Sequence, residues 1–298
     1  MYSEIDSNKR KTVLLMFGFF VFVGAIAFGV GWYMHSYYIT IFALVFAVGY
    51  IFWSYYASDK LALSVNNARQ IEKADNIRLW RIVENLAITD GLPMPKVYII
   101  DDPAPNAFAT GRDPKHAGVT VTTGLLDIMD DNELTGVIAH ELGHVQNYDI
   151  RVSMIAFGLV AVVSIISDTV LRWMFWGGVS SDGDGDSDSV SNPIVLAVGI
   201  VAIVLAPIVA TMIQLSISRK REYLADATGA LTTRYPQGLA SALQKISDHG
   251  SAMQKQSAST AHLFFANPLK KGSFTSLFST HPPIEDRIAK LQEMETRV

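Results

Sequence analysis

The residues best suited to chemistry lie in the stretch VIAHELGHVQNYD, residues 137–149. His140 and His144 are four positions apart, so in an α-helix their imidazoles share one face and can reach a single ion. Glu141 projects to the side of that pair, where its carboxylate can activate a water beside the metal. The chain has only 7 histidines in 298 residues, so this spacing favours a metal site over a solvated helix with scattered polar residues.

A third ligand is expected in the segment SISRKREYLADATGAL, residues 216–231. Glu222 and Asp226 are again four positions apart and share one helix face. A glutamate completes a His-His-Glu set with one open coordination position, which is typical of catalytic rather than structural zinc. Asp226 is placed to accept the second N–H of a ligand imidazole and to fix its tautomer. Alone, this carboxylate pair is equally typical of an ordinary charged helix.

Long uncharged segments predict that the chain crosses a membrane. Half of the residues are hydrophobic, 17% are charged and the mean hydropathy is +0.26, which is high for a soluble domain. Residues 12–34 and 38–57 contain no charged residue, and each is near the roughly 20 residues that cross a bilayer. Residues 152–176 form a weaker third candidate, because two charges interrupt them and a buried or interfacial helix is the alternative. Residues 193–216 form the fourth.

Basic residues predict the orientation of these four spans. Lys9, Arg10 and Lys11 precede the first span, which by the positive-inside rule places the N-terminus in the cytoplasm. The histidine pair and Glu222 then lie on the same cytoplasmic side, so together they are a strong candidate for one metal site. The predicted division of the chain has four parts. A tail and transmembrane hairpin cover 1–57, and a first part of the domain that carries the metal site covers 58–151. A second hairpin with an acidic external loop at 178–192 covers 152–216, and the second part of the domain covers 217–298.

The segments that position the histidines are expected to form a mainly α-helical domain with a small sheet. Residues 96–100 and 118–122 are predicted to be short strands. Asp130 or Asp131 is expected to cap the helix that carries the histidines. The predicted fold class is therefore an α-helical membrane protein with four transmembrane helices and a cytoplasmic, mainly α (α+β), zincin-like catalytic domain.

Four motifs resemble those of the HtpX heat-shock proteases, the bacterial branch of the membrane zinc metalloproteases that also include the CAAX prenyl proteases. These motifs are NAFATG at 106–111, HELGH at 140–144, EYLAD at 222–226 and STHPPIEDR at 279–287. The resemblance covers nearly the whole chain. It implies a zinc endopeptidase of the bacterial inner or plasma membrane, with both termini in the cytoplasm, that cleaves misfolded or damaged membrane proteins during heat or envelope stress.

The same resemblance implies individual roles. His140, His144 and Glu222 would bind one Zn²⁺ per chain, and Glu141 would be the catalytic acid and base. Asn106 is a candidate to hold substrate backbone, although a turn-forming asparagine is an equally good explanation.

His281 and Arg287 are candidates to stabilise the oxyanion or to fill the open zinc position at rest, mainly on the strength of the same resemblance. For His281, a polar entry to a helix is the alternative. The strand at 118–122 is expected to bind the substrate as an added strand.

Two other classes of protein share parts of this pattern. An intramembrane protease also carries His-Glu-x-x-His, but here polar DDNEL precedes the motif and QNYDIR follows it, so the motif lies in water. A catalytically inactive or weakly active membrane-anchored chaperone or scaffold of the same fold is the other alternative, and the intact Glu141 argues against it. No Gly-x-x-x-x-Gly-Lys phosphate loop is present. We therefore expect the lipid bilayer and unfolded or damaged membrane proteins as partners, with no nucleotide and no nucleic acid.

Overall fold

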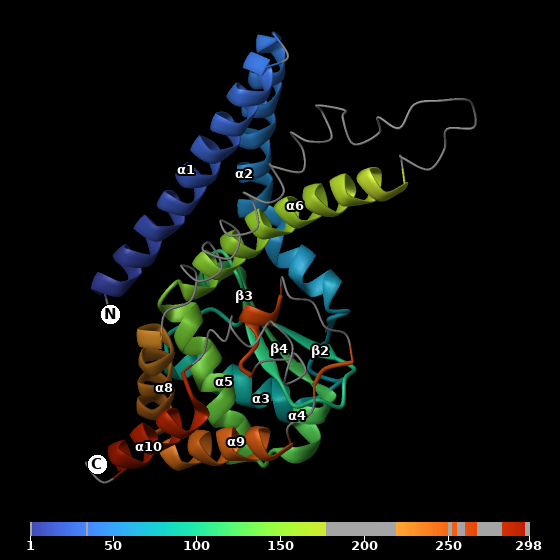
Figure 1. Ribbon diagram of the computed structural model, residues 1–298. Helices are drawn as coiled ribbons and strands as arrows, with labels where there is room; N and C mark the ends of the chain where they lie inside the picture. The colour runs from blue at the N-terminus through green and yellow to red at the C-terminus, as the bar shows by residue number, and fades with distance from the viewer. Residues whose placement is uncertain are drawn as a thin grey trace.

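A pair of long helices stands out from a compact domain in the computed structural model (Figure 1). The structure describes residues 2–33, 35–176, 219–249, 252–254, 260–266 and 282–295. The pair consists of α1, Tyr2–Tyr33, and α2, Tyr37–Val65. Within it, Glu4–Gly29 and Tyr37–Val65 are long and apolar enough to cross a membrane, and only 22% and 11% of their most apolar windows are buried. This exposure distinguishes the two helices from the core helices of a soluble protein.

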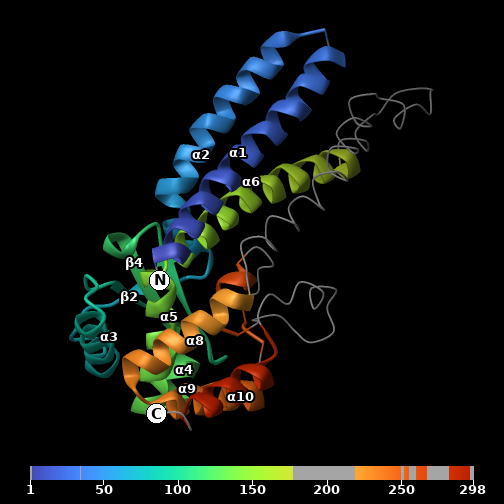
Figure 2. The same cartoon turned by 90° about the vertical axis from the view of Figure 1, so that its left-hand side faces the viewer.

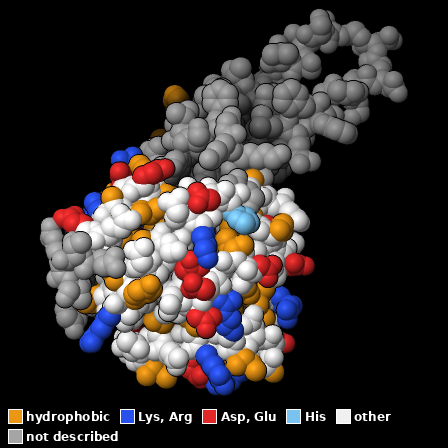
Figure 3. Space-filling model, turned by 90° about the horizontal axis from the view of Figure 1, so that it is seen from below, with side chains coloured by type: hydrophobic (Ala, Val, Ile, Leu, Met, Phe, Trp, Pro, Cys, Tyr) orange, Lys and Arg blue, Asp and Glu red, His pale blue; other side chains and the backbone are white. Residues whose placement is uncertain are grey.

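The domain face opposite the hairpin has the character of a water-facing surface. Acidic and basic side chains are interspersed there, and hydrophobic side chains are scattered among them (Figure 3). On α1 and α2, by contrast, large apolar side chains such as Phe17, Trp32, Phe42 and Phe52 are exposed. The two predicted N-terminal spans are therefore found as candidate membrane helices, with α2 continuing to Val65 beyond the predicted limit at residue 57.

The third predicted span lies in a helix that the structure describes, whereas the fourth does not lie among the described residues. Residues 152–176 lie within α6, a continuous helix over Asp149–Trp176. The first half of α6 packs against α1 and α2 in an apolar cluster that includes Leu15, Ala47 and Ile155. Residues 193–216 and the acidic loop lie outside the described residues, so the second hairpin and the domain boundaries drawn around it stay predictions.

A small mixed sheet forms one side of the domain. Its strands are β1, Arg69–Gln70, β2, Lys96–Ile100, β3, Ala107–Gly111, and β4, Ala117–Thr122. Their order is β1-β2-β4-β3, with β4 parallel to β2 and antiparallel to β3. The predicted strands at 96–100 and 118–122 are both present. However, β4 has a neighbour on each side and cannot accept an added substrate strand, so that expectation was wrong. The edge strands are β1 and β3, and β3 is the edge next to β4.

Helices pack around the sheet and around a central helix, α5, which is almost entirely buried. The remaining helices are α3, Ile77–Thr89, α4, Thr123–Ile128, α5, Asp131–Gln146, α8, Arg219–Thr233, α9, Pro236–His249, and α10, Ile284–Glu295, with 3-10 turns at Pro114–His116 and Ala261–Leu263. From different sides, α3, α8 and α9 contact α5 (Figure 2), and β3 contacts it as well. Residues from both ends of the chain therefore share one core.

Local sequence explains where α5 begins and how closely α8 approaches it. Asp130 is the N-cap: its side chain accepts a hydrogen bond from the Glu133 amide, and the Glu133 side chain accepts one from the Asp130 amide. This reciprocal pair satisfies two amides at the start of the helix and confirms the expected cap. At the crossing of α5 and α8, a Cβ on Gly229 would lie 3.0 Å from the His140 backbone nitrogen. The absence of a side chain at Gly229 thus lets α8 lie directly on the histidine-bearing turn.

Candidate metal centre

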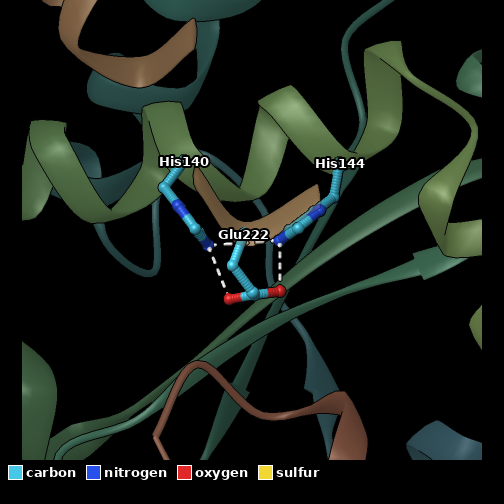
Figure 4. Close-up of side chains that lie close together, drawn as sticks. All are labelled: His140, His144 and Glu222. Atoms are coloured by element: carbon cyan, nitrogen blue, oxygen red, sulfur yellow. Dashed lines mark hydrogen bonds and ion pairs between the residues drawn. The ribbon is translucent and has the colours of Figure 1, made fainter. Parts of the chain in front are cut away.

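Three side chains from two helices converge on one point (Figure 4). His140 and His144 project from α5, and Glu222 projects from α8. One ligand atom from each lies within 4.8 Å of the others. The two Nε2 atoms are 3.1 Å apart, the His140 Nε2 is 3.8 Å from Glu222 Oε2, and the His144 Nε2 is 3.5 Å from Glu222 Oε1. Two imidazole nitrogens and a carboxylate oxygen are the donors of a catalytic zinc site with one open position.

Each of the two histidines is oriented by its own aspartate, in addition to facing Glu222. The Nδ1 of His140 lies 2.9 Å from Asp226 Oδ1, and the Nδ1 of His144 lies 3.0 Å from Asp149 Oδ2. Each Nδ1–H is thereby directed to an acceptor, which leaves each Nε2 on the side of Glu222 and able to bind a metal once it carries no proton. Asp226 lies, as expected from the sequence, within hydrogen-bonding distance of the second ring nitrogen of a predicted ligand histidine. Asp149 is a functional candidate that the sequence analysis missed, because it follows the end of α5 and helical spacing does not bring it to His144.

Arg287 lies behind this first set of residues. Its side chain is 1% exposed and donates to both oxygens of Asp226, with Nε–Oδ2 and Nη2–Oδ1 distances of 2.9 and 2.6 Å. Its guanidinium also lies 4.8 Å from the ring centroid of Phe265. These contacts place Arg287 against the carboxylate that orients His140, and its Nη1 also lies 3.8 Å from Glu222 Oε2. A role of Arg287 at the oxyanion or at the open metal position stays a prediction.

The other two predicted substrate residues have separate outcomes. The Asn106 side chain accepts a hydrogen bond from the Ala266 amide at 3.0 Å and donates to the Ala266 carbonyl at 2.8 Å. It therefore holds a chain segment of the protein itself alongside the start of β3. His281 lies outside the described residues. A further histidine, His262, lines the same pocket as Glu141 and the histidine pair; no motif in the sequence distinguished it.

In the metal-free protein the pKa values of the two histidines are shifted in opposite directions. Burial lowers the pKa of His140 to about 4, and the hydrogen bond to Asp226 only partly opposes it. Burial also lowers the pKa of His144, but the hydrogen bond to Asp149 and the negative charges around it outweigh burial and raise the pKa to about 9. At neutral pH His140 is therefore uncharged, whereas His144 is an imidazolium with a proton on both ring nitrogens. A metal ion that binds His144 would displace one of these protons.

The buried charges around the site are unbalanced without a cation. Among the described residues, four buried carboxylates surround it and two buried guanidiniums oppose them. The excess is two negative charges when both histidines are neutral, as metal ligands must be; in the metal-free protein at neutral pH the charge on His144 offsets one of them. The carboxylates are Glu141, Asp149, Glu222 and Asp226, and the guanidiniums are Arg221 and Arg287. Uncompensated buried charge is costly, and a divalent cation between the histidines and Glu222 balances this excess. The residues therefore fit a divalent metal in both donor type and charge.

Comparisons with known proteins agree with this chemistry. Residues 73–295 match the model of Peptidase family M48. The chain is 54% identical to a "Protease HtpX homolog" of Tropheryma whipplei, strain TW08/27, over 99% of this chain and 98% of that protein. It is 45% identical to one of Ligilactobacillus salivarius over 99% and 100% of the two chains. The crystal structure of S. mikatae Ste24p shares the fold, with 21% identity and a TM-score of 0.50 over 98% of this chain and 67% of that one.

The apolar hairpin, the helical domain and these matches together define a membrane metalloprotease. More particularly, the chain belongs to Peptidase family M48, and its full-length relatives are HtpX proteases. Membership of a metalloprotease family implies a bound metal. Within the described part of the chain, one group of residues is able to hold it, namely His140, His144 and Glu222.

Proposed function

We propose that this protein is a zinc-dependent endopeptidase that cleaves misfolded or damaged membrane proteins from the cytoplasmic side of the membrane. In this proposal His140, His144 and Glu222 bind the zinc. The observation that carries it is the convergence of these three side chains on a pocket that also contains Glu141. The excess of two buried negative charges around them independently supports a divalent ion.

The residues of the chain then have distinct tasks in peptide hydrolysis. Zinc, when bound, lowers the pKa of an attacking water toward about 7 and polarises the scissile carbonyl. Glu141 accepts the proton of that water and donates it to the leaving amine. Asp226 and Asp149 accept the Nδ1–H groups of the two histidines and keep each Nε2 available to the metal. Arg287 neutralises Asp226 and fixes its orientation.

The substrate is expected to pair with the outer edge of β3. The Ala107 carbonyl accepts a hydrogen bond from the Phe265 amide at 2.8 Å, so the Ala107 backbone faces away from β4. Backbone groups alternate in direction along an antiparallel strand, so Ala109 faces the same way. Ala109 also lines the pocket that contains the histidine pair. An extended peptide bound beside Ala109 would therefore pass the metal, with backbone hydrogen bonds that require no particular sequence.

The position of the site supports membrane-proximal substrates. His144 is followed after a few residues by α6, whose first half packs on the hairpin. Glu4 of α1 also pairs with Lys220, two residues before Glu222, at 2.7 Å. The metal site thus lies beside the N-terminal end of α1, the end that this proposal puts in the cytoplasm. A tail that emerges unfolded from the bilayer can reach it, whereas a folded soluble protein offers no extended strand.

The decisive experiment compares three proteins purified in detergent and loaded with zinc: the unaltered chain, Glu141→Ala and Glu222→Ala. Cleavage of unfolded casein and self-cleavage are measured beside the zinc content. Glu141→Ala should keep one zinc per chain and lose at least 10²-fold in kcat/KM, because it removes only the proton carrier. Glu222→Ala should lose zinc as well as activity. Full zinc occupancy in Glu222→Ala would remove this residue from the ligand set, and normal cleavage by Glu141→Ala would refute the mechanism.

A further inference from the structure

The cytoplasmic end of the first candidate membrane helix contacts the shell of residues around the metal site. Asn8 of α1 is 0% exposed. Its Nδ2 donates to Asp149 Oδ1 at 2.7 Å and to the Asn147 carbonyl at 2.9 Å. The other oxygen of Asp149 lies 3.0 Å from the Nδ1 of His144. A continuous chain of hydrogen bonds therefore joins α1 to a predicted metal ligand, across 141 residues of sequence.

An asparagine is chemically matched to this position. Both of its partners, a carboxylate oxygen and a backbone carbonyl, are acceptors, and an amide nitrogen supplies two N–H donors. The contact with Asp149 involves a charged acceptor and is buried, which makes it stronger than a neutral hydrogen bond at the surface. A hydrophobic side chain would leave both acceptors without this donor, and a carboxylate would repel Asp149.

The turn that carries Asp149 is held from several sides. Tyr148, between α5 and α6, has a φ of 61°, a left-handed backbone conformation that residues other than glycine adopt only at a cost in free energy. Lys9 of α1 lies 5.1 Å from the Tyr148 ring centroid. Arg221 of α8 lies 3.5 Å from Asp149 Oδ1. Asn8 and Arg221 thus both engage Oδ1 of Asp149, and its Oδ2 remains directed at His144.

We propose that Asn8 is a positioning residue for the metal: it fixes the Asp149 carboxylate and, through it, the His144 imidazole. The first membrane helix is then a structural part of the metal site as well as an anchor. Correct seating of α1 against the domain is coupled to metal affinity, so a protein with a displaced N-terminal helix holds its metal more weakly. This inference rests on the proposed ligand set, in which His144 binds zinc.

The test is a set of zinc affinities measured on the full chain in detergent by competition with a chelator. Asn8→Leu is the main variant, because leucine has the same branched outline and the same number of side-chain non-hydrogen atoms and favours a helix, but has no donor. Asp6→Ala is the matched control, since Asp6 is an exposed polar residue of the same helix. Asp149→Asn and the double variant Asn8→Leu/Asp149→Asn complete a cycle, and His144→Ala tests the ligand set separately.

Losing the direct partner of a metal-bound histidine typically weakens metal binding 10- to 100-fold. We therefore expect a loss of that size for Asp149→Asn and, one contact further out, a loss of about 3- to 10-fold for Asn8→Leu. In the Asp149→Asn background, Asn8→Leu should add less than about 2-fold, because its route to the metal is already broken. Asp6→Ala should bind zinc like the unaltered chain.

Two results would overturn the proposal. In one, the Asn8→Leu protein binds zinc as tightly as the Asp6→Ala protein, or the Asn8→Leu substitution weakens zinc binding by the same factor in the unaltered and in the Asp149→Asn backgrounds. In the other, thermal unfolding shows that Asn8→Leu destabilises the metal-free and zinc-loaded proteins equally, which is a purely structural effect; weaker zinc binding instead reduces the stabilisation that zinc adds. Unchanged zinc binding by His144→Ala would refute the ligand set, a failure distinct from either of these.

Discussion

The buried contact between Arg287 and Asp226 allows a quantitative test of how the site is built. Both side chains are nearly inaccessible, at 1% and 3% exposure, and two hydrogen bonds of 2.6 and 2.9 Å join them. Burial by itself would raise the pKa of Asp226, but the Arg287 charge and the hydrogen bonds from His140 and Arg287 outweigh it and lower the pKa. Asp226 is therefore a buried anion whose charge depends on Arg287.

Arg287→Met keeps an unbranched apolar stem and removes the charged guanidinium. Removing one partner of a buried ion pair costs about 3–5 kcal/mol. Because Asp226 retains its hydrogen bond with His140, we expect a loss near the lower value of about 3 kcal/mol. For a domain of this size each kcal/mol shifts Tm by about 2–4 °C, so the expected fall is about 6–12 °C.

The assay is thermal unfolding of the metal-free protein in detergent, followed by tryptophan fluorescence, for Arg287→Met, Asp226→Asn and the double variant. In the double variant residue 226 no longer carries the charge that Arg287 opposed, so its Tm should lie above that of Arg287→Met. If Arg287 instead served the oxyanion, as the sequence allowed, Arg287→Met would lower kcat with little change in Tm. A Tm within 2 °C of the unaltered protein would therefore contradict the role that we assign to Arg287.

Three further predictions test the capped helix, the edge strand and the membrane. Burial by itself would raise the pKa of Glu133, but hydrogen bonds from Lys245, Ser241 and the Asp130 amide outweigh it and lower the pKa. The ionised Glu133 therefore stabilises the fold above about pH 4.5, and this contribution is lost as the pH falls through the folded pKa. Glu133→Gln should therefore lower Tm at pH 7 and differ progressively less from the unaltered metal-free protein below pH 4.5, and a difference that does not change with pH would contradict this reasoning. Ala109→Pro should lower kcat/KM about 10-fold at full zinc content, because it removes one outward amide and about 1.4 kcal/mol of substrate binding; unchanged cleavage would exclude β3 as the substrate edge. In liposomes, an unstructured tail anchored in the membrane should be cleaved faster than the same tail released from its anchor, with cuts near the membrane, and equal rates would indicate a general protease.

The sequence by itself determined those features that depend on short spacings and on composition. The four-residue interval between His140 and His144 places both imidazoles on one face of any helix, so the pair could be identified without a fold. The apolar segments at 12–34 and 38–57 predicted candidate membrane helices because bilayer thickness sets the length of such a segment. Asp130 could be expected as the cap of α5 because capping involves only neighbouring residues.

Only the tertiary structure decided which distant residues meet. The alternation at 118–122 indicated a strand but contained no information on its neighbours, and β4 is central because β2 and β3 both pair with it. Arg287 faces Asp226 across 61 residues, and Asn8 faces Asp149 across 141. These contacts depend on how α1 packs against α6 and how α10 packs against α8. Helical and strand periodicity is set by local backbone geometry, whereas the choice of partner follows from how elements far apart in the sequence bury their apolar faces together.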